Sequence, residues 1–232
     1  MDSDSINNNL MKVTDEIQKA CERVGRDPST VKLIAVSKNF SAETIREAFV
    51  AGQYLFGENR VQELCTKMPL LPAEIEWHLI GTLQRNKVKN VVGKTALIHS
   101  VDSFSLAEEI SKQAIKKDLL VNILLQVNIA GESAKHGFAP GKLMEEIKEI
   151  CKLSRIKIKG LMTIAPLVDH PEKVRLIFRQ LKILAESIEN LQLPRVEMQE
   201  LSMGMSDDFQ VAVEEGATLV RIGSRIFGRR NY

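Results

Sequence analysis

The sequence predicts an α/β protein folded as a single-domain (β/α)8 TIM barrel. Short apolar runs rich in β-branched residues alternate with segments of helical periodicity, which is typical of a parallel sheet built from βαβ units. Counting these runs gives eight strand candidates, and 232 residues is a length that suits one such barrel. No stretch rich in Pro, Gly or Ser divides the chain, so one domain is expected. A doubly wound open sheet is the alternative that this pattern leaves open.

The strands are expected where the apolar runs occur: at Val31–Val36, Tyr54–Gly57, Trp77–Gly81, Leu97–Val101, Ile123–Val127, Ile158–Ile164, Leu201–Met203 and Leu219–Ile222. Each run except the last is followed by a segment with the pattern of a helix. Residues 10–232 are assigned to the barrel domain, and the polar residues 1–9 are expected to be disordered.

Three helices have the clearest signals. Residues 11–24 show apolar side chains near helical spacing. A second helix is expected to start behind Ser41, a good N-cap, and to stop near Gly52. A third begins after His170 with Pro171 at its first position. Its apolar face is made up of Val174, Ile177, Phe178, Leu181, Leu184 and Ile188.

Composition and charge argue against several classes of protein. The chain has 32 Lys and Arg against 30 Asp and Glu, so neither nucleic acid nor a membrane surface is expected as a partner. No apolar run approaches the roughly 20 residues that span a bilayer, and the acidic N-terminus is not that of a signal peptide. Cys21, Cys65 and Cys151 form no CxxC pair, which indicates neither a disulfide framework nor a structural zinc site. A cytoplasmic protein is predicted, and its balanced charge and single domain favour a monomer.

Lys38 is the first candidate for chemistry. Functional groups of such a barrel collect at the carboxyl ends of the strands, and the first predicted strand ends in Lys38. A lysine ammonium aimed into a pocket is costly to desolvate, which favours the neutral amine. That amine can form a Schiff base with an aldehyde. The alternative is a lysine that leaves the barrel rim for water.

Two segments of small residues lie at the seventh and eighth predicted strands. Ser202-Met203-Gly204 and Gly223-Ser224 can offer backbone N–H groups and hydroxyls to an oxyanion. The loops after these two strands are the usual phosphate site of TIM barrels. Ser206 is expected to cap the following helix and to direct its N-terminus to the same place. Tight turns that need glycine are the alternative.

Two further polar side chains fall within predicted strands. Arg221 lies two residues before Gly223, so the two positions share one face of the strand. On the barrel interior Arg221 needs an acceptor, whereas on the opposite face it pairs with a helix carboxylate. His78 is expected to be a satisfied core histidine, with pocket lining as the alternative. The four histidines show no metal-binding spacing, so no metal site is expected.

Seven motifs follow one another along the chain: Leu33–Lys38, Phe56–Glu63, Trp77–Lys87, Val127–Gly137, Gly160–Thr163, Leu201–Asp207 and Arg221–Gly228. In this order they resemble one family, the pyridoxal phosphate homeostasis proteins, also called the YggS or PROSC family. The match extends from about residue 10 to residue 230. Seven motifs in register are far more specific than any one of them.

The resemblance implies pyridoxal 5′-phosphate as cofactor, on a barrel like the N-terminal domain of alanine racemase (fold type III). It implies eight binding residues: Lys38 through a Schiff base, Ser202, Gly223 and Ser224 at the phosphate, Arg221 at the pyridine nitrogen, and Asn59, His78 and Met162 around the ring. No departure from the family pattern at Lys38 or Arg221 puts the cofactor in doubt.

The resemblance also implies a binding protein without turnover. Arginine can only donate to the ring nitrogen, which leaves the ring a poorer electron sink. A racemase needs a second acid or base, which catalytic relatives supply as a tyrosine from an additional domain. The tyrosines here are Tyr54, at the wrong end of a predicted strand, and Tyr232 at the C-terminus.

The expected function is therefore maintenance of the intracellular cofactor pool, by buffering the cofactor or delivering it to apo-enzymes, with indirect effects on amino-acid and keto-acid pools. Two alternatives stay open: a pyridoxal-phosphate-dependent, racemase-like enzyme, and a cofactor-independent Schiff-base aldolase that uses Lys38. Lys135, in a glycine-bounded loop, is a candidate for a second, transient aldehyde site.

Overall fold

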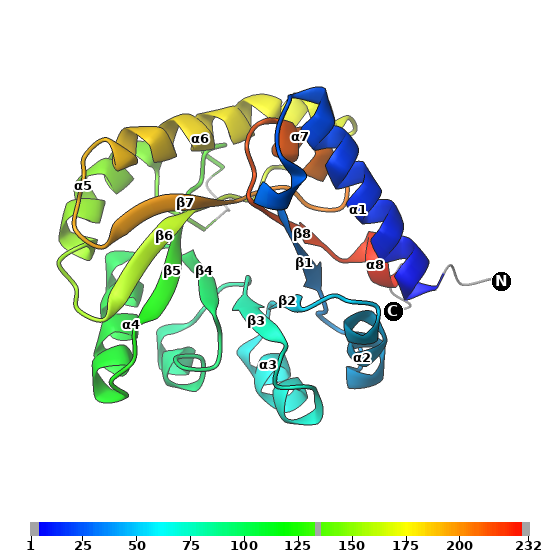
Figure 1. The fold of residues 1–232 in the computed structure, drawn as a ribbon. Coiled ribbons are helices and arrows are strands. Elements are labelled where there is room, and N and C mark those ends of the chain that lie inside the picture. The colour runs from blue at the N-terminus through cyan, green and yellow to red at the C-terminus, as the bar shows by residue number, and fades with distance from the viewer. Residues whose placement is uncertain (1–4, 133–135, 229–232) are drawn as a thin grey trace.

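Eight parallel strands close into a barrel in which every strand pairs with the next and β8 returns to β1. The computed structural model describes residues 5–132 and 136–228. Its strands, drawn in Figure 1, are β1 (Lys32–Val36), β2 (Leu55–Glu58), β3 (Glu76–Leu79), β4 (Leu97–Val101), β5 (Val121–Gln126), β6 (Ile156–Met162), β7 (Val196–Ser202) and β8 (Leu219–Ile222). Each overlaps the run predicted for it, so the (β/α)8 barrel is confirmed and the open sheet is excluded.

Helices form the outer layer of the barrel (Figure 1). They are α1 (Ile6–Arg23), α2 (Ala42–Val50), α3 (Val61–Lys67), α4 (Phe104–Lys116), α5 (Pro140–Ile150), α6 (Arg175–Glu189), α7 (Phe209–Glu214) and α8 (Ser224–Phe227). Short 3-10 helices accompany them at η1 (Pro28–Thr30), η2 (Met68–Leu70), η3 (Arg85–Asn90) and η4 (Pro171–Val174). The connection after β3 holds η3 in place of an α-helix, and α8 follows the last strand, where no helix was predicted.

The N-terminal helix begins earlier than predicted. α1 starts at Ile6 with Ser5 as its N-cap, so the expectation of disorder over residues 1–9 is wrong for residues 5–9. Residues 1–4 lie outside the described part of the chain. The polar start of α1 carries no apolar periodicity, but Asn9 Nδ2 donates to the carbonyl of Ile226 at 3.0 Å. This contact between distant parts of the chain has no signal in local spacing.

Two later helices differ from their predictions in detail. The helix after His170 is confirmed, but it consists of η4 followed by α6, and two of its expected core residues, Ile177 and Leu184, are only half-buried. α7 starts at Phe209, so Ser206 does not cap it. The carboxylate of Asp208 accepts the backbone N–H of Met205 at 2.6 Å instead.

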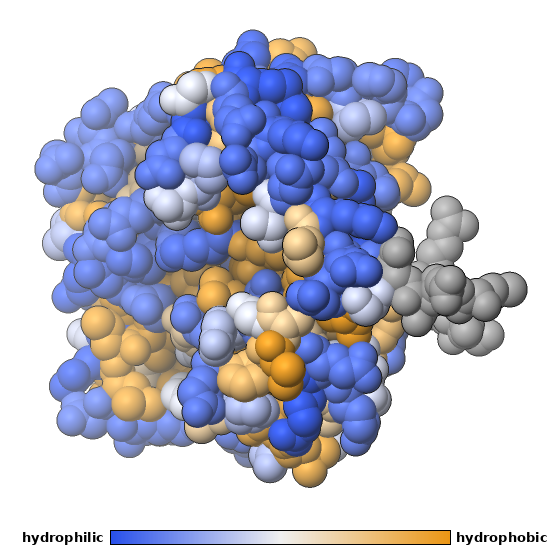
Figure 2. All heavy atoms as spheres, turned by 45° about the vertical axis from the view of Figure 1, so that its right-hand side comes forward, coloured by the Kyte–Doolittle hydropathy of each residue, from blue (hydrophilic) through white to orange (hydrophobic). Residues whose placement is uncertain are grey.

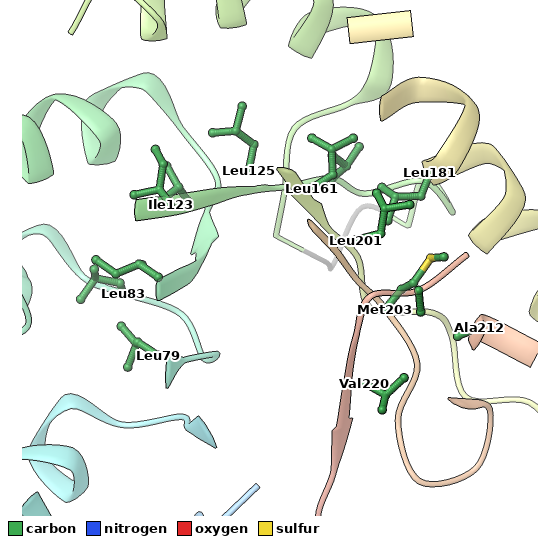
Figure 3. Packing of buried hydrophobic residues seen from close by; sticks show 14 of the residues in the cluster. Leu79, Leu83, Ile123, Leu125, Leu161, Leu181, Leu201, Met203, Ala212 and Val220 are labelled. Carbon is green, nitrogen blue, oxygen red and sulfur yellow. The ribbon is translucent and has the colours of Figure 1, made fainter. Parts of the chain in front are cut away.

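Apolar side chains pack on both faces of the strands. Inside the barrel lies a small cluster of Ile34, Leu97, Leu124, Met162 and Leu219. A much larger cluster fills the space between strands and helices and is shown in part in Figure 3, where Leu79, Ile123, Leu161, Leu201 and Val220 are labelled. Because successive residues of a strand point to opposite faces, the strand sequences decide which cluster each side chain joins.

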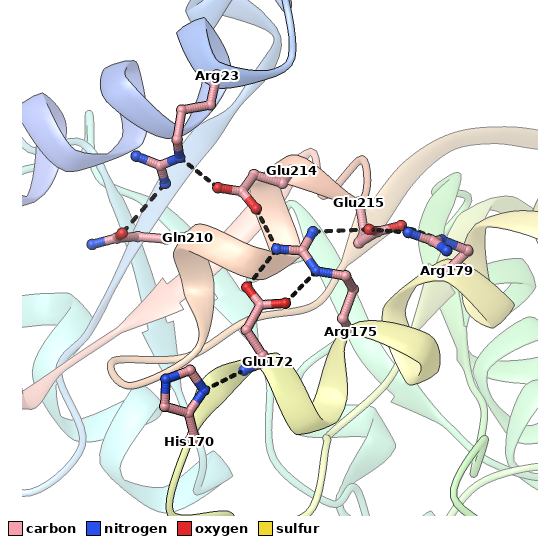
Figure 4. A network of polar contacts seen from close by, with 8 residues as sticks. All are labelled: Arg23, His170, Glu172, Arg175, Arg179, Gln210, Glu214 and Glu215. Carbon is pink, nitrogen blue, oxygen red and sulfur yellow. Dashed lines mark hydrogen bonds and ion pairs between the residues drawn. The ribbon is translucent and has the colours of Figure 1, made fainter.

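A network of ion pairs joins the helices beside β7 and β8 (Figure 4). Arg175 donates to Glu172 at 2.6 Å, to Glu214 at 2.5 Å and to Glu215 at 2.9 Å. Arg23, at the end of α1, donates to Glu214 at 2.6 Å. Hydrogen bonds between ionised groups are stronger than neutral ones, and these tie η4, α6, α7 and α1 into one wall.

Hydrophilic residues cover most of the face seen in Figure 2, and apolar residues reach that surface in smaller areas between them. Within the described residues, no helix is both long and apolar enough to cross a membrane.

Gly160 lets β6 and β7 approach each other closely. Its φ is +152°, and a Cβ at this position would lie 1.8 Å from the carbonyl oxygen of Glu200 in β7. We expect Gly160→Ala to lower the free energy of unfolding by ~1–3 kcal/mol, because a strand must shift to relieve the overlap. Urea denaturation measures this loss. Gly141→Ala is the control, since a Cβ there meets nothing within 4 Å. Equal losses in the two variants would contradict the steric argument.

Candidate functional site

The predicted site residues collect at the carboxyl end of the barrel. Lys38 follows β1, Asn59 follows β2, Ser202 ends β7, and Gly223 and Ser224 follow β8. The strands are all parallel, so these positions lie at one mouth. Because β7, β8 and β1 are neighbours in the closed sheet, Lys38 and the two small-residue segments share one side of that mouth.

Lys38 is half-buried in the turn that leaves β1. The preceding strand alternates, with Ile34 in the interior cluster and Ser37 buried against the outer layer. Lys38 comes two residues after the last residue of β1, which places it at the carboxyl end of the barrel. Phe40 stacks on Phe227 of α8 with ring centroids 4.8 Å apart. The turn that carries Lys38 is thereby tied to the segment that follows β8.

Arg221 is buried inside the barrel, with 5% of its surface exposed. Its Nη1 donates to Ser202 Oγ at 2.5 Å and its Nη2 donates to the carbonyl of Thr163 at 2.9 Å. The alternative of an outward arginine paired with a helix carboxylate is therefore wrong. Burial lowers the pKa of Arg221 to about 10, although the negative charge of Asp208 acts in the opposite direction and raises it. The guanidinium remains a cation at neutral pH.

The hydrogen bonds of Arg221 continue as a chain across the interior. Ser202 Oγ lies 2.8 Å from His99 Nδ1, and His99 Nε2 lies 2.9 Å from His78 Nδ1. His78 Nε2 lies 3.2 Å from the carboxylate of Glu76. Arginine can only donate and a carboxylate can only accept, so Arg221 donates to Ser202 and His78 Nε2 donates to Glu76. The directions of the two hydrogen bonds that join Ser202, His99 and His78 depend on the tautomers of the imidazoles.

His78 thus has both ring nitrogens hydrogen-bonded, as expected of a satisfied core histidine. Its partner His99 is completely buried. Burial is the main reason that the pKa of His99 lies well below its usual range, and His78 and Arg221 lower it further. Protonating His99 would put a second cation beside Arg221, so the neutral form belongs to the folded state.

The hydroxyl of Ser202 is engaged within the barrel, where it accepts from Arg221 and lies 2.8 Å from His99 Nδ1. Its contact with a phosphate stays a prediction. Another pair of hydroxyls lies at the mouth, where Ser224 Oγ donates to Ser206 Oγ at 3.0 Å. Ser224 is exposed. Ser206, expected to cap a helix, therefore joins Ser224 as a group able to meet an anion.

A pocket of about 260 Å³ opens at the same mouth, lined by Asn59, Ile80, Gly81, Thr82, Gln126, Val127, Asn128, His136 and Ile164. Gly81 packs so closely on Asn59 that an added Cβ would lie 2.4 Å from the Asn59 carbonyl oxygen. Met162 is fully buried in the interior cluster. Contacts of Asn59, His78 and Met162 with a ligand stay predictions. Over residues 5–132 and 136–228, no three His, Cys, Asp or Glu side chains are grouped to hold a metal ion.

Residues 8–231 match the family described as the alanine racemase N-terminal domain. The chain is 47% identical over 227 residues to the pyridoxal phosphate homeostasis protein of Aquifex aeolicus (strain VF5), covering 96% of this chain and 97% of that protein. The chain belongs to the pyridoxal phosphate homeostasis protein family. The member of this family from Helicobacter pylori (strain J99) is 44% identical over 202 residues, which cover 85% of this chain and 87% of that protein.

Solved structures agree with this membership. The PipY protein of Synechococcus elongatus PCC7942, solved with PLP bound, is 39% identical and superposes with a TM-score of 0.80 over 92% of this chain and all of that chain. Alanine racemase of Clostridium difficile 630 superposes with a TM-score of 0.76 at 15% identity. This chain covers 58% of that racemase, and at this identity the likeness concerns the fold alone.

His99 is the member of the interior chain for which no role was predicted. Its signal is periodicity, because Leu97 faces the interior and residue 99 shares that face of β4. Ser206 also carries a usable signal, as a hydroxyl in the segment after β7. What neither position reveals is its partner, because Ser202 is 103 residues from His99 and Ser224 is 18 residues from Ser206.

The neutral state of His99 predicts a dependence of stability on pH. The unfolded chain binds a proton at His99 below about pH 6.5 while the folded chain does not, so stability falls as pH decreases. We expect the free energy of unfolding of the unmodified protein to fall more steeply below pH 6.5 than that of His99→Gln, by up to ~1.4 kcal/mol per pH unit. Chemical denaturation between pH 7.5 and about pH 5 measures both slopes. The exposed His170→Gln is the control, and equal slopes for the unmodified protein and His99→Gln would contradict a neutral, buried His99.

Proposed function

We propose that the protein binds pyridoxal 5′-phosphate at the barrel mouth and maintains its supply in the cell, as a buffer and donor of the cofactor. The observation that carries this proposal is that three groups come from adjacent strands: Lys38 after β1, Arg221 in β8, and the Ser206–Ser224 pair after β7 and β8. The cofactor offers one partner to each, since its aldehyde meets an amine, its ring nitrogen meets a donor and its phosphate meets hydroxyls. PLP in the PipY structure supports the assignment.

Each residue would have a distinct task. Lys38 would hold the cofactor through a Schiff base, for which its amine must be neutral. Ser206, Ser224 and the backbone at Gly223 would hold the phosphate. Ser202 would also act indirectly, because its hydroxyl accepts from Arg221 and so orients the guanidinium from within the barrel.

Arg221 limits what the bound group can do. The cofactor supplies an electron-withdrawing ring that stabilises negative charge beside a linked amine. An arginine at the ring nitrogen donates a hydrogen bond and keeps its proton, because its pKa of about 10 lies well above neutral pH. The ring is then a weak electron sink, which suits storage better than turnover.

A second acid or base for racemisation is also lacking among the described tyrosines. Tyr54 precedes β2 at the amino end of the barrel, where it is half-exposed and meets Phe49 edge-on at 5.2 Å. Tyr232 lies outside the described residues. We therefore propose that the protein turns over no amino acid. A racemase-like enzyme is the second candidate, because His136 lines the pocket and lies 3.4 Å from Asp102, as an oriented acid–base group does.

The partners and compartment belong to the same proposal. The half-buried Lys38 and exposed Ser224 give a bound cofactor a route out, which suits transfer to apo-enzymes. Cysteines 21, 65 and 151 are all free, which fits the reducing cytoplasm. The balanced charge and single barrel favour a monomer. Lys135, the candidate for a second aldehyde site, lies outside the described residues.

The absorption spectrum tests cofactor attachment. We expect the protein saturated with pyridoxal phosphate to show a Schiff-base band at the violet edge of the visible spectrum, and Lys38→Ala to lack it. Lys87→Ala, which removes a lysine of η3, is the control and is expected to keep the band. A colourless unmodified protein that takes up no pyridoxal phosphate would overturn the proposed function.

Exchange of an isotope label tests the absence of turnover. The loaded protein is incubated with amino acids deuterated at the α-carbon, and loss of the label is followed by mass spectrometry. We expect loss no faster than with free pyridoxal phosphate, because Arg221 weakens the electron sink. Label loss that exceeds this background and disappears in His136→Asn would establish the racemase-like alternative.

A further inference from the structure

A buried cluster of charged side chains lies directly behind Lys38, between β1, β2 and α3. It consists of Ser37, Glu58, Glu63 and Lys67, and we call it the α3 cluster. Lys67 Nζ lies 2.7 Å from Glu58 Oε1 and 2.8 Å from Glu63 Oε2. Ser37 Oγ also donates to Glu58 Oε1 at 2.7 Å. Among the described residues, no hydrogen bond or ion pair joins these side chains to the pocket or to the hydroxyl pair at the mouth. The proposed binding contacts therefore do not explain the cluster.

Lys67 is held in one orientation. A lysine ammonium has three N–H donors, and Lys67 directs one to each carboxylate and the third to the backbone carbonyl of Ser37 at 2.9 Å. Its side chain is only 11% exposed. An ammonium with all three donors committed in a buried site has little freedom to move, and it fixes the carbonyl that immediately precedes Lys38.

The residue after Lys38 is held by the same cluster. The backbone N–H of Asn39 donates to Glu63 Oε2 at 2.8 Å, the oxygen that also receives Lys67. Asn39 has a φ of +66°, in the left-handed region that most residues avoid. The chain is therefore anchored to α3 on both sides of Lys38, through Ser37 and through Asn39.

The cluster is a costly way to stabilise a fold. Burial raises the pKa of Glu58, although the hydrogen bonds from Lys67 and Ser37 act in the opposite direction and lower it. Its second oxygen, Oε2, is buried without a hydrogen-bond partner among the described residues. Apolar side chains of similar volume usually stabilise such a position as well as a buried ion pair does. A role other than stability accounts better for charges placed here.

We propose that Lys67, with Glu63, is a positioning residue that sets Lys38 for attack on the cofactor aldehyde. This inference rests on the proposed function. The neutral amine of Lys38 attacks the aldehyde carbon, the C–N bond forms, and the aldehyde oxygen leaves as water with both amine protons to give the C=N bond. The rate and yield of this step depend on the position of the Lys38 amine. Binding of the ring and the phosphate group of the cofactor does not.

Two ligands separate positioning from general structural support. Pyridoxal 5′-phosphate can bond to Lys38, whereas pyridoxamine 5′-phosphate shares its ring and phosphate but has an amine in place of the aldehyde. We expect Lys67→Met to weaken binding of pyridoxal 5′-phosphate about 10- to 100-fold, with binding of pyridoxamine 5′-phosphate unchanged within about twofold. Borohydride reduction followed by mass spectrometry should show correspondingly slower labelling of Lys38.

Lys117→Met is the matched control. Lys117 also fixes backbone through its ammonium, which donates to the carbonyls of Lys89 and Val92, both at 2.8 Å, on another side of the barrel. Its loss removes comparable hydrogen bonds but should leave the ratio of the two affinities unchanged. Glu63→Ala frees Asn39 and removes one acceptor of Lys67, but it leaves the bond from Lys67 to the Ser37 carbonyl in place. It gives a second test if Lys67→Met does not fold, and it should lower the same ratio.

Equal weakening of both ligands by Lys67→Met or Glu63→Ala would overturn the inference and leave the cluster a purely structural role. Unchanged binding of both ligands would overturn it as well. An unmodified protein that binds neither ligand would instead overturn the proposed function, and this inference with it.

Discussion

A guanidinium buried inside a barrel must find acceptors there, and the polar interior of this protein is arranged around that requirement. Arg221 has one acceptor in the Thr163 carbonyl and another in the Ser202 hydroxyl. The Ser202 hydroxyl in turn lies within hydrogen-bond distance of His99, and His99 lies within hydrogen-bond distance of His78. The chain ends at Glu76, whose pKa is lowered chiefly by its hydrogen bond with His78. One buried charge is thus linked through a chain of hydrogen bonds to Ser202, His99, His78 and Glu76.

The mouth is supported from two directions. From within, the interior chain aims Arg221, and from outside, the α3 cluster anchors the backbone around Lys38. The network of Arg175 secures α7, which follows the segment of Ser206. The groups proposed to meet the ligand are therefore held in place by contacts made elsewhere in the fold. Such preorganisation lowers the ordering cost of binding.

The sequence predicted most strands well because they are short apolar runs, and burial of such runs leaves little choice of structure. Of β7 only Leu201 and Ser202 were predicted, because its first five residues include Glu197, Gln199 and Glu200 and are not buried. The barrel mouth followed from topology once the strands were counted. The use of the Ser202 hydroxyl could not be predicted, because its partners His99 and Arg221 come from other strands, 103 and 19 residues away. The helical start at Ile6 was missed for a related reason, since Asn9 meets Ile226 at the far end of the chain. Local patterns specify elements, whereas side-chain partners depend on the closed fold.

The pairing of β8 with β1 closes the sheet, and Lys38 and Arg221 lie on opposite sides of that seam. A chain emerging from the ribosome carries Lys38 long before Arg221 has been made, so the amine exists without its companion donor until β8 has been made. A ligand held by both strands binds only the closed barrel and stabilises it by mass action. Such a ligand therefore makes the seam between β8 and β1 harder to open, and its absence leaves the same seam easier to open.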